Sequence, residues 1–168
     1  MGDNPDTPDP GTGLTGKEVA AIRESWGKLT ASWKTYGPEF YGILIEDPDV
    51  RKFFKSFNGM KMEEIRTSAK LRAHAINFKH GITSFVDNLD DLDCLVVLVH
   101  KLTANHFRRE IRIEHFKEAF RLFLNFAQSK MEMDELTVNA WVKTVKVLED
   151  VIGKHMDELD SQTNDKAT

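Results

Sequence analysis

The sequence predicts an all-α fold, because apolar residues recur three and four positions apart along most of the chain. The clearest stripe contains Leu95, Leu98, Val99 and Leu102, which share one face of a helix. The chain has 168 residues, enough for one domain with a sizeable core. Its ends are polar, so we expect a flexible N-terminal arm over residues 1–13, one domain over 14–159 and a flexible tail over 160–168.

The composition argues against several classes of protein. The formal net charge of −4 provides no basic surface of the kind that nucleic acids need. No run of about 18 apolar residues is long enough to span a membrane, and no charged-then-apolar leader is present. The single cysteine, Cys94, rules out an internal disulfide framework and fits a reducing compartment. We therefore expect a cytoplasmic protein that binds neither nucleic acid nor membranes.

The first helix begins at Thr15, a good N-cap residue, and Glu18 three positions later completes a capping box. The inward stripe of this helix contains Val19, Ile22, Trp26, Leu29 and Trp33. Both tryptophans are interpreted as core residues.

A second helix is expected to open at Gly37-Pro38, with the proline near its first turn. It ends at Asp47-Pro48, because the residue before a proline avoids the helical region. Its inward side chains are Phe40, Tyr41, Leu44 and Ile45. A short helical turn then leads to Phe53-Phe54-Lys55-Ser56-Phe57, where the aromatic rings suit either a packed core or the wall of a flat ligand. Residues 58–67 are a charged, methionine-rich connection.

The next helix, over residues 71–89, places a histidine on its inner side. Its apolar face contains Leu71, Ala75, Phe78, Ile82, Phe85, Val86 and Leu89. His74 lies on the same side as Phe78, four residues on. His80 lies on a different face and is expected to contact solvent.

A second inward histidine, His106, lies near the end of the following helix. The acidic residues of the segment Asp90–Asp93 cap the start of that helix. His106 continues the apolar stripe four positions after Leu102, so its Nδ1 is within reach of the Leu102 carbonyl, leaving Nε2 free to bind a metal. A lone histidine on an apolar face is usually a packed core residue. Two such helices, however, can face each other across a flat ligand. His100 is the rival ligand on this helix, about 120° around it.

Two more helices complete the chain. Phe116, Phe120, Phe123 and Leu124 give one of them its core face. The last helix is expected over residues 134–159, with an inward face of Val138, Trp141, Val145, Leu148, Ile152 and Met156.

These motifs, in this order and at these separations, resemble the globin family over roughly residues 14–159. Leu102-x-x-x-His106 followed by Ile111 and Phe116 resembles the proximal helix and the corner after it. Phe54-x-x-Phe57 after Pro48, His74-x-x-x-Phe78 and Trp26 resemble the haem-edge turn, the distal pair and the first-helix tryptophan. Gly37-Pro38-Glu39-Phe40-Tyr41, Ser84–Asp91 and Ala104-Asn105-His106 are most similar to bivalve haemoglobins.

The resemblance implies a globin fold of about eight helices around one haem b. His106 would be the proximal iron ligand, and His74 would face the gas or the iron. Phe54, Phe78, Leu102, Ile111 and Phe116 would contact the haem, with Phe53 as the alternative to Phe54. Arg109, and also Arg108, would lie near the haem propionates. Counting forward from Trp26 puts Tyr41 in the distal pocket, whereas counting back from Pro48 puts Phe40 there; we favour Tyr41.

The resemblance further implies reversible dioxygen binding, for transport or storage, with His74 and Tyr41 donating to the gas and no enzymatic activity beyond minor haem redox chemistry. Other small gases would also bind, and a homodimer or tetramer is plausible by the same likeness. The alternatives are a bis-histidyl globin, with His74 and His106 both on the iron, for redox work or gas sensing, and a nitric oxide dioxygenase or pseudo-peroxidase. A helical interaction module without a cofactor is a further alternative, which would be colourless when purified.

Overall fold

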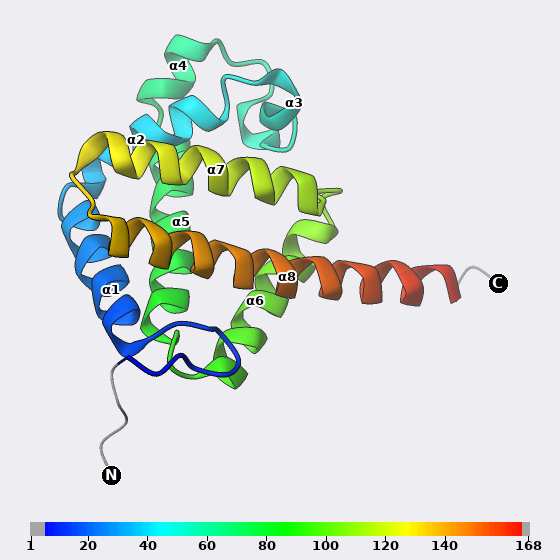
Figure 1. Ribbon diagram of the computed structural model, residues 1–168. Coiled ribbons are helices and arrows are strands. Elements are labelled where there is room, and N and C mark those ends of the chain that lie inside the picture. The colour runs from blue at the N-terminus through cyan, green and yellow to red at the C-terminus, as the bar shows by residue number, and fades with distance from the viewer. Residues whose placement is uncertain (1–5, 166–168) are drawn as a thin grey trace.

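The computed structural model describes residues 6–165, which form eight α-helices and one 3-10 turn and include no strand (Figure 1). The helices are α1 (Gly16–Ala31), α2 (Trp33–Leu44), α3 (Pro48–Arg51), α4 (Met62–Thr67), α5 (Ala69–Asp87), α6 (Leu92–Phe107), α7 (Ile113–Lys130) and α8 (Glu135–Asp165), with the 3-10 turn η1 (Lys55–Phe57) between α3 and α4. The all-α prediction is therefore confirmed.

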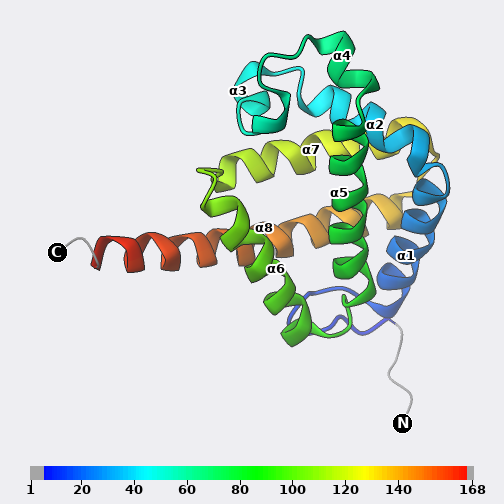
Figure 2. The same cartoon turned by 180° about the vertical axis from the view of Figure 1, so that it is seen from behind.

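The helices pack as a two-layer sandwich. In Figure 1, α7 and α8 cross in front of α5 and α6, and Figure 2 shows the same pairs from behind. Helix α1 packs on both α5 and α8, and α2 packs on α5 and α7, so these two helices join the layers. No helix among residues 6–165 is long and apolar enough to cross a membrane.

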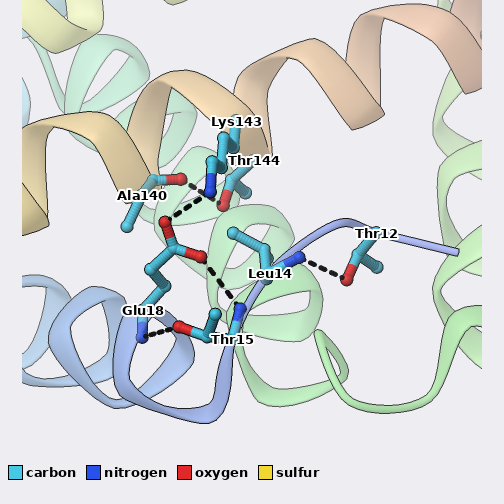
Figure 3. Close-up of polar contacts among 7 residues, drawn as sticks. All are labelled: Thr12, Leu14, Thr15, Glu18, Ala140, Lys143 and Thr144. Carbon is cyan, nitrogen blue, oxygen red and sulfur yellow. Dashed lines mark hydrogen bonds and ion pairs between the residues drawn. The ribbon is translucent and has the colours of Figure 1, made fainter. Parts of the chain in front are cut away.

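The predicted capping box at the start of α1 is present and extends into a tertiary contact (Figure 3). The Glu18 backbone N–H donates to the Thr15 hydroxyl, and the Thr15 N–H donates to Glu18 Oε2 at 2.8 Å. The other carboxylate oxygen of Glu18 accepts from Lys143 Nζ on α8 at 2.7 Å. Glu18 is 5% exposed, so one buried carboxylate both caps α1 and ties it to α8.

The chain before α1 packs against the domain over its last few residues. Asp9 Oδ1 accepts hydrogen bonds from the backbone N–H groups of Gly11 and Thr12, which closes a turn. Thr12 is 6% exposed, and a Cβ at Gly11 would overlap a methyl group of Leu92, in the first turn of α6. Residues 1–5 of the expected arm lie outside the described residues.

Helix α2 begins earlier than the sequence predicts. It starts at Trp33 rather than at Gly37-Pro38, so Pro38 lies inside the helix. The Trp33 indole donates to the Ala75 carbonyl on α5 at 2.8 Å, and this contact fixes the first turn. Gly37 is needed there because a Cβ would lie 2.6 Å from Trp33 Nε1.

Two other segments are more helical than expected. The connection over residues 58–67 contains the short helix α4. Helix α8 continues to Asp165, past the expected end at Leu159, and its side chains from Asp160 to Asp165 are exposed. Its last buried residue is Met156, so the tertiary core ends there. Residues 166–168 lie outside the described residues, and the flexible tail stays a prediction.

Candidate functional site

The histidine near the end of α6 has one ring nitrogen fixed and the other free. His106 Nδ1 lies 2.8 Å from the Leu102 carbonyl, one turn earlier, so Nδ1 carries the proton and donates. No hydrogen bond within residues 6–165 engages Nε2. Burial lowers the pKa of His106, the hydrogen bond to Leu102 partly opposes that shift, and the Arg109 charge lowers it further. The ring is therefore neutral at pH 7 and presents a free Nε2 lone pair.

The corner after α6 folds back over His106. The His106 carbonyl accepts from the backbone N–H groups of Arg109 at 2.9 Å and Ile111 at 3.2 Å. Glu110, between them, adopts a left-handed conformation with φ of 64°. The Phe116 ring, in the first turns of α7, lies 5.1 Å from the His106 ring. The corner therefore brings Ile111 and Phe116 back beside the histidine.

The histidine on α5 lies in an aromatic setting. His74 is half-buried, and its ring centroid lies 5.0 Å from Phe54, 5.4 Å from Phe57 and 6.1 Å from Tyr41. Its Nε2 lies 3.2 Å from the hydroxyl of Ser56 in η1. Burial lowers the pKa of His74, and the Arg109 charge lowers it further.

Arg109 connects the two histidines electrostatically. Its guanidinium lowers the pKa of His74 on α5 and also that of His106 on α6. We use the name candidate pocket for His74 on α5, His106 on α6 and the side chains predicted to lie around them, of which Phe54, Phe57 and Tyr41 contact His74 and Phe116 contacts His106.

The structure distinguishes Tyr41 from Phe40 by their neighbours. Phe40 is fully buried and packs on Phe123 and Phe126 of α7. Tyr41 instead contacts the rings of Phe54 and His74, so it borders the candidate pocket. Its hydroxyl makes no hydrogen bond to any residue from 6 to 165, and burial raises the pKa of that hydroxyl.

Phe53 and Phe54 point to different neighbours. Phe54 contacts Tyr41 and His74, whereas the Phe53 ring lies 4.8 Å from His115 of α7. Of the two, Phe54 is therefore the one grouped with His74.

Phe78 also borders the candidate pocket on the α5 side, and it is half-buried. Its ring stacks on Trp33 and meets the edge of Tyr41 at 6.0 Å. Leu102 on α6, four positions and about one turn before His106, is half-buried as well and packs on the core. Phe54 and Ile111 share this intermediate burial.

These features suit a flat apolar cofactor that contains a metal. Five large apolar side chains at the candidate pocket keep some solvent exposure. Four are half-buried, namely Phe54, Phe78, Leu102 and Ile111, and Phe116 is 9% exposed. No cluster of three or more His, Cys, Asp or Glu side chains within residues 6–165 is arranged to hold a metal ion. If His106 held an iron through its one free imidazole nitrogen, a cofactor would have to supply the other ligands. A porphyrin does so, and Arg109 suits its carboxylate edge.

The other histidines face elsewhere, and some neighbours were not identified from the sequence. His100, the rival ligand, stacks on His155 of α8 with ring centroids 3.9 Å apart. His80 is exposed.

Sequence reasoning missed Ser56 beside His74, and nothing in the local pattern marks it, because the contact joins residues 18 positions apart. Arg108 is exposed, and its charge is not among those that shift either histidine.

Comparisons with known proteins identify the family of the chain. The family model for globins matches residues 39–152. The chain is 34% identical to Hemoglobin-3 of Phacoides pectinatus over 149 residues, which cover 88% of this chain and 97% of that haemoglobin. It is 29% identical to the Globin-2 B chain of Anadara inaequivalvis, over 76% of this chain and 85% of that one.

A solved structure has the same fold. Ferric myoglobin of Aplysia limacina superposes with a TM-score of 0.77 at 22% identity, covering 84% of this chain and 98% of the myoglobin. This likeness confirms the predicted globin fold, and the sequence matches confirm the resemblance to mollusc haemoglobins. The chain belongs to the globin family.

Proposed function

We propose that this chain holds one haem b through His106 and binds dioxygen reversibly. The observation that carries the proposal is the state of the His106 ring: its Nδ1 is fixed by Leu102, and its Nε2 is free beside the candidate pocket. A histidine arranged in this way is oriented and made more basic for metal binding. The family, and relatives named haemoglobin, support haem and oxygen binding.

When bound, haem would supply a ferrous iron able to hold a diatomic gas. Leu102, Ile111 and Phe116 would pack against the ring beside that ligand. Arg109 would pair with a propionate, because a guanidinium matches a carboxylate in shape and charge. That pair would be exposed, so we expect it to contribute little to haem affinity, about 0–1 kcal/mol.

On the gas side, Tyr41 and His74 would supply hydrogen-bond donors. The Tyr41 hydroxyl makes no hydrogen bond to residues 6–165, so it would be available to donate to a bound gas. His74 is neutral at pH 7 because its pKa is lowered, and a neutral imidazole keeps one N–H to donate. Phe54 and Phe78 would hold the haem and exclude water, which slows oxidation of ferrous iron.

We propose a five-coordinate resting iron rather than the bis-histidyl alternative, in which His74 and His106 both bind the iron. The His74 Nε2 lies 3.2 Å from the Ser56 hydroxyl, so this nitrogen would have to exchange that contact to reach either the iron or a bound gas. Our proposal includes a cytoplasmic location, homodimers or tetramers, and no enzymatic role beyond minor haem redox chemistry.

The test is the visible spectrum of the dithionite-reduced protein, expressed with ample haem, under argon and then in air. We expect one broad visible band that splits on oxygenation. Two sharp bands under argon would instead show that a side chain such as His74 occupies the iron. Absence of a Soret band would refute haem binding altogether.

A pair of variants assigns the ligand. His106→Gly should lose haem during gel filtration and regain a five-coordinate spectrum when free imidazole is added, because imidazole can fill the vacated position. His100→Gly removes a histidine from the same helix and should retain haem, since His100 stacks on His155 away from the candidate pocket. Equal haem retention by the parent and His106→Gly would refute the ligand assignment.

A further inference from the structure

Two histidines outside the candidate pocket stack on each other where α6 and α8 pack together. The ring centroids of His100 on α6 and His155 on α8 lie 3.9 Å apart, and the ring planes are 8° from parallel. Both residues are half-buried. His155 is next to Met156, the last buried residue of α8, and Figure 1 shows the end of this helix projecting past the other helices. The pair therefore lies where α8 leaves the core.

A carboxylate on α8 orients one of the two rings. His155 Nδ1 lies 2.9 Å from Glu158 Oε2, so Nδ1 carries the proton and donates. No hydrogen bond within residues 6–165 engages the other nitrogen, His155 Nε2, which keeps its lone pair. A carboxylate placed behind a histidine in this way fixes the ring and makes the opposite nitrogen a better metal ligand.

The second ring has two nitrogens that the fold leaves unused. Neither nitrogen of His100 makes a hydrogen bond to the described part of the chain. Within residues 6–165, every side-chain nitrogen or oxygen that is shielded from water has a hydrogen-bond partner, so the unpartnered nitrogens of His100 and His155 are reached by solvent. Burial lowers the pKa of His100, the His155 charge lowers it further, and Glu158 partly opposes these effects. A neutral imidazole in contact with water can take up a metal ion from solution.

The spacing of the two rings suits a shared ion. Imidazole nitrogen binds Zn²⁺ at about 2.0–2.1 Å, so two such nitrogens on one tetrahedral ion lie about 3.4 Å apart. The ring spacing of 3.9 Å is close to that value, and a small tilt of either ring closes the difference. No third His, Cys, Asp or Glu side chain within residues 6–165 completes a metal-binding cluster with them. Water molecules would therefore supply the remaining ligands, as they do at open zinc sites.

We propose that His100 and His155 together bind one divalent zinc-like metal ion between α6 and α8, with Glu158 as a positioning residue behind His155. Zinc, copper and nickel ions all accept imidazole ligands, and zinc is chosen as the probe because it has no redox chemistry. The bound ion would join α8 to α6 at the point where α8 leaves the core. The site uses no residue of the candidate pocket, so the proposal does not depend on haem binding.

The experiment titrates zinc chloride into the haem-loaded full chain in its carbon monoxide form, which keeps the candidate pocket occupied. Isothermal titration calorimetry gives the stoichiometry and the affinity, and zinc X-ray absorption identifies the ligands. We expect one tight site per chain, with two imidazole nitrogens at about 2.0–2.1 Å from the ion. Hydrogen exchange of peptides that cover residues 150–160 should slow when zinc binds, because the ion joins two helices.

Matched variants separate this site from other histidines and acids. His100→Ala and His155→Ala each remove one ligand and should each weaken zinc binding more than about tenfold, whereas His80→Ala removes an exposed histidine of α5 and should change nothing. Glu158→Ala should weaken binding about tenfold, because His155 loses the group that orients it. Asp157→Ala removes the neighbouring exposed acid and should have little effect. The carbon monoxide spectrum and circular dichroism show whether each variant is folded.

The possible outcomes are distinct. Zinc binding that is lost in both His100→Ala and His155→Ala and kept in His80→Ala supports the site. Loss in only one of the first two variants, or equal weakening in His80→Ala, means an adventitious ion only and overturns the site. Equal effects of Glu158→Ala and Asp157→Ala overturn the positioning role of Glu158. Zinc that binds without slowing hydrogen exchange over residues 150–160 overturns the link between α6 and α8.

Discussion

Replacing Tyr41 by phenylalanine tests the gas side of the candidate pocket with the smallest possible change. The substitution removes one hydroxyl and keeps the ring that contacts Phe54 and His74. Because this hydroxyl has no hydrogen-bond partner within residues 6–165, its loss breaks no contact of the fold. Any effect on gas binding is then separable from an effect on stability.

The expected size follows from the chemistry of the missing hydrogen bond. Bound dioxygen carries partial negative charge, and a hydrogen bond to a charged group contributes about 1.5–3 kcal/mol. Since about 1.4 kcal/mol corresponds to a factor of ten, dioxygen should leave Tyr41→Phe about ten to a hundred times faster. His74 donates to the same gas, so the lower end of this range is expected. The haem-free variant should be about as stable as the parent, because the hydroxyl makes no hydrogen bond within residues 6–165.

The assay is stopped-flow displacement of dioxygen by carbon monoxide, paired with urea unfolding of the haem-free protein. Tyr36→Phe is the matched control: it removes the hydroxyl of the other tyrosine, on the same helix, where the ring contacts Phe126 and Lys130. It should leave the dissociation rate unchanged. An unchanged rate in Tyr41→Phe would remove Tyr41 from the gas site. A loss of stability above about 1 kcal/mol would show that the hydroxyl is bonded within the fold.

Two predictions concern the scaffold. Glu18→Gln should lower the free energy of unfolding at pH 7 by about 1 kcal/mol, because it removes the carboxylate that pairs with Lys143. Burial raises the pKa of Glu18, but hydrogen bonds from Lys143 and the capping box outweigh it and the net pKa is lowered. The carboxylate therefore stabilises the fold fully above its unfolded pKa of about 4.3 and loses that effect as pH falls further, so urea unfolding should show the difference shrinking by pH 3. Gly37→Ala should cost about 1–3 kcal/mol, because its Cβ would lie 2.6 Å from Trp33 Nε1. Gly42→Ala, where the added Cβ would meet only the end of an arginine side chain, should be neutral or stabilising in the same unfolding assay.

The parts of the fold that the sequence predicted well are those governed by neighbours along the chain. The Thr15 and Glu18 capping box is a local pattern, and it is present. Asp91 caps α6 by accepting from the Cys94 N–H, as expected for an acidic residue before an apolar stripe. The hydrogen bond from His106 to Leu102 is likewise set by a four-residue spacing.

Where tertiary contacts decide, local patterns failed. A Gly-Pro pair is typical of a helix start, yet α2 begins at Trp33 and continues through Pro38. The sequence does not indicate that the Trp33 indole reaches the Ala75 carbonyl, 42 residues away, which secures the extra turn. The same holds for Ser56 at His74 and for the joint effect of Arg109 on two histidines.

The earlier start of α2 also explains why Tyr41, rather than Phe40, lies beside His74. Trp33 and Phe40 are seven residues apart, nearly two full turns, so they share a face, and both pack on Phe78. Tyr41 follows one position later, about 100° around the helix, and that rotation brings it to His74. Counting forward from Trp26 pointed to Tyr41 and counting back from Pro48 pointed to Phe40, because each count crosses a helix boundary. A count from Trp33 stays within one helix. The Tyr41 hydroxyl makes no hydrogen bond to residues 6–165, so no hydrogen bond of the fold calls for a tyrosine at this position. A gas bound as proposed would accept such a hydrogen bond.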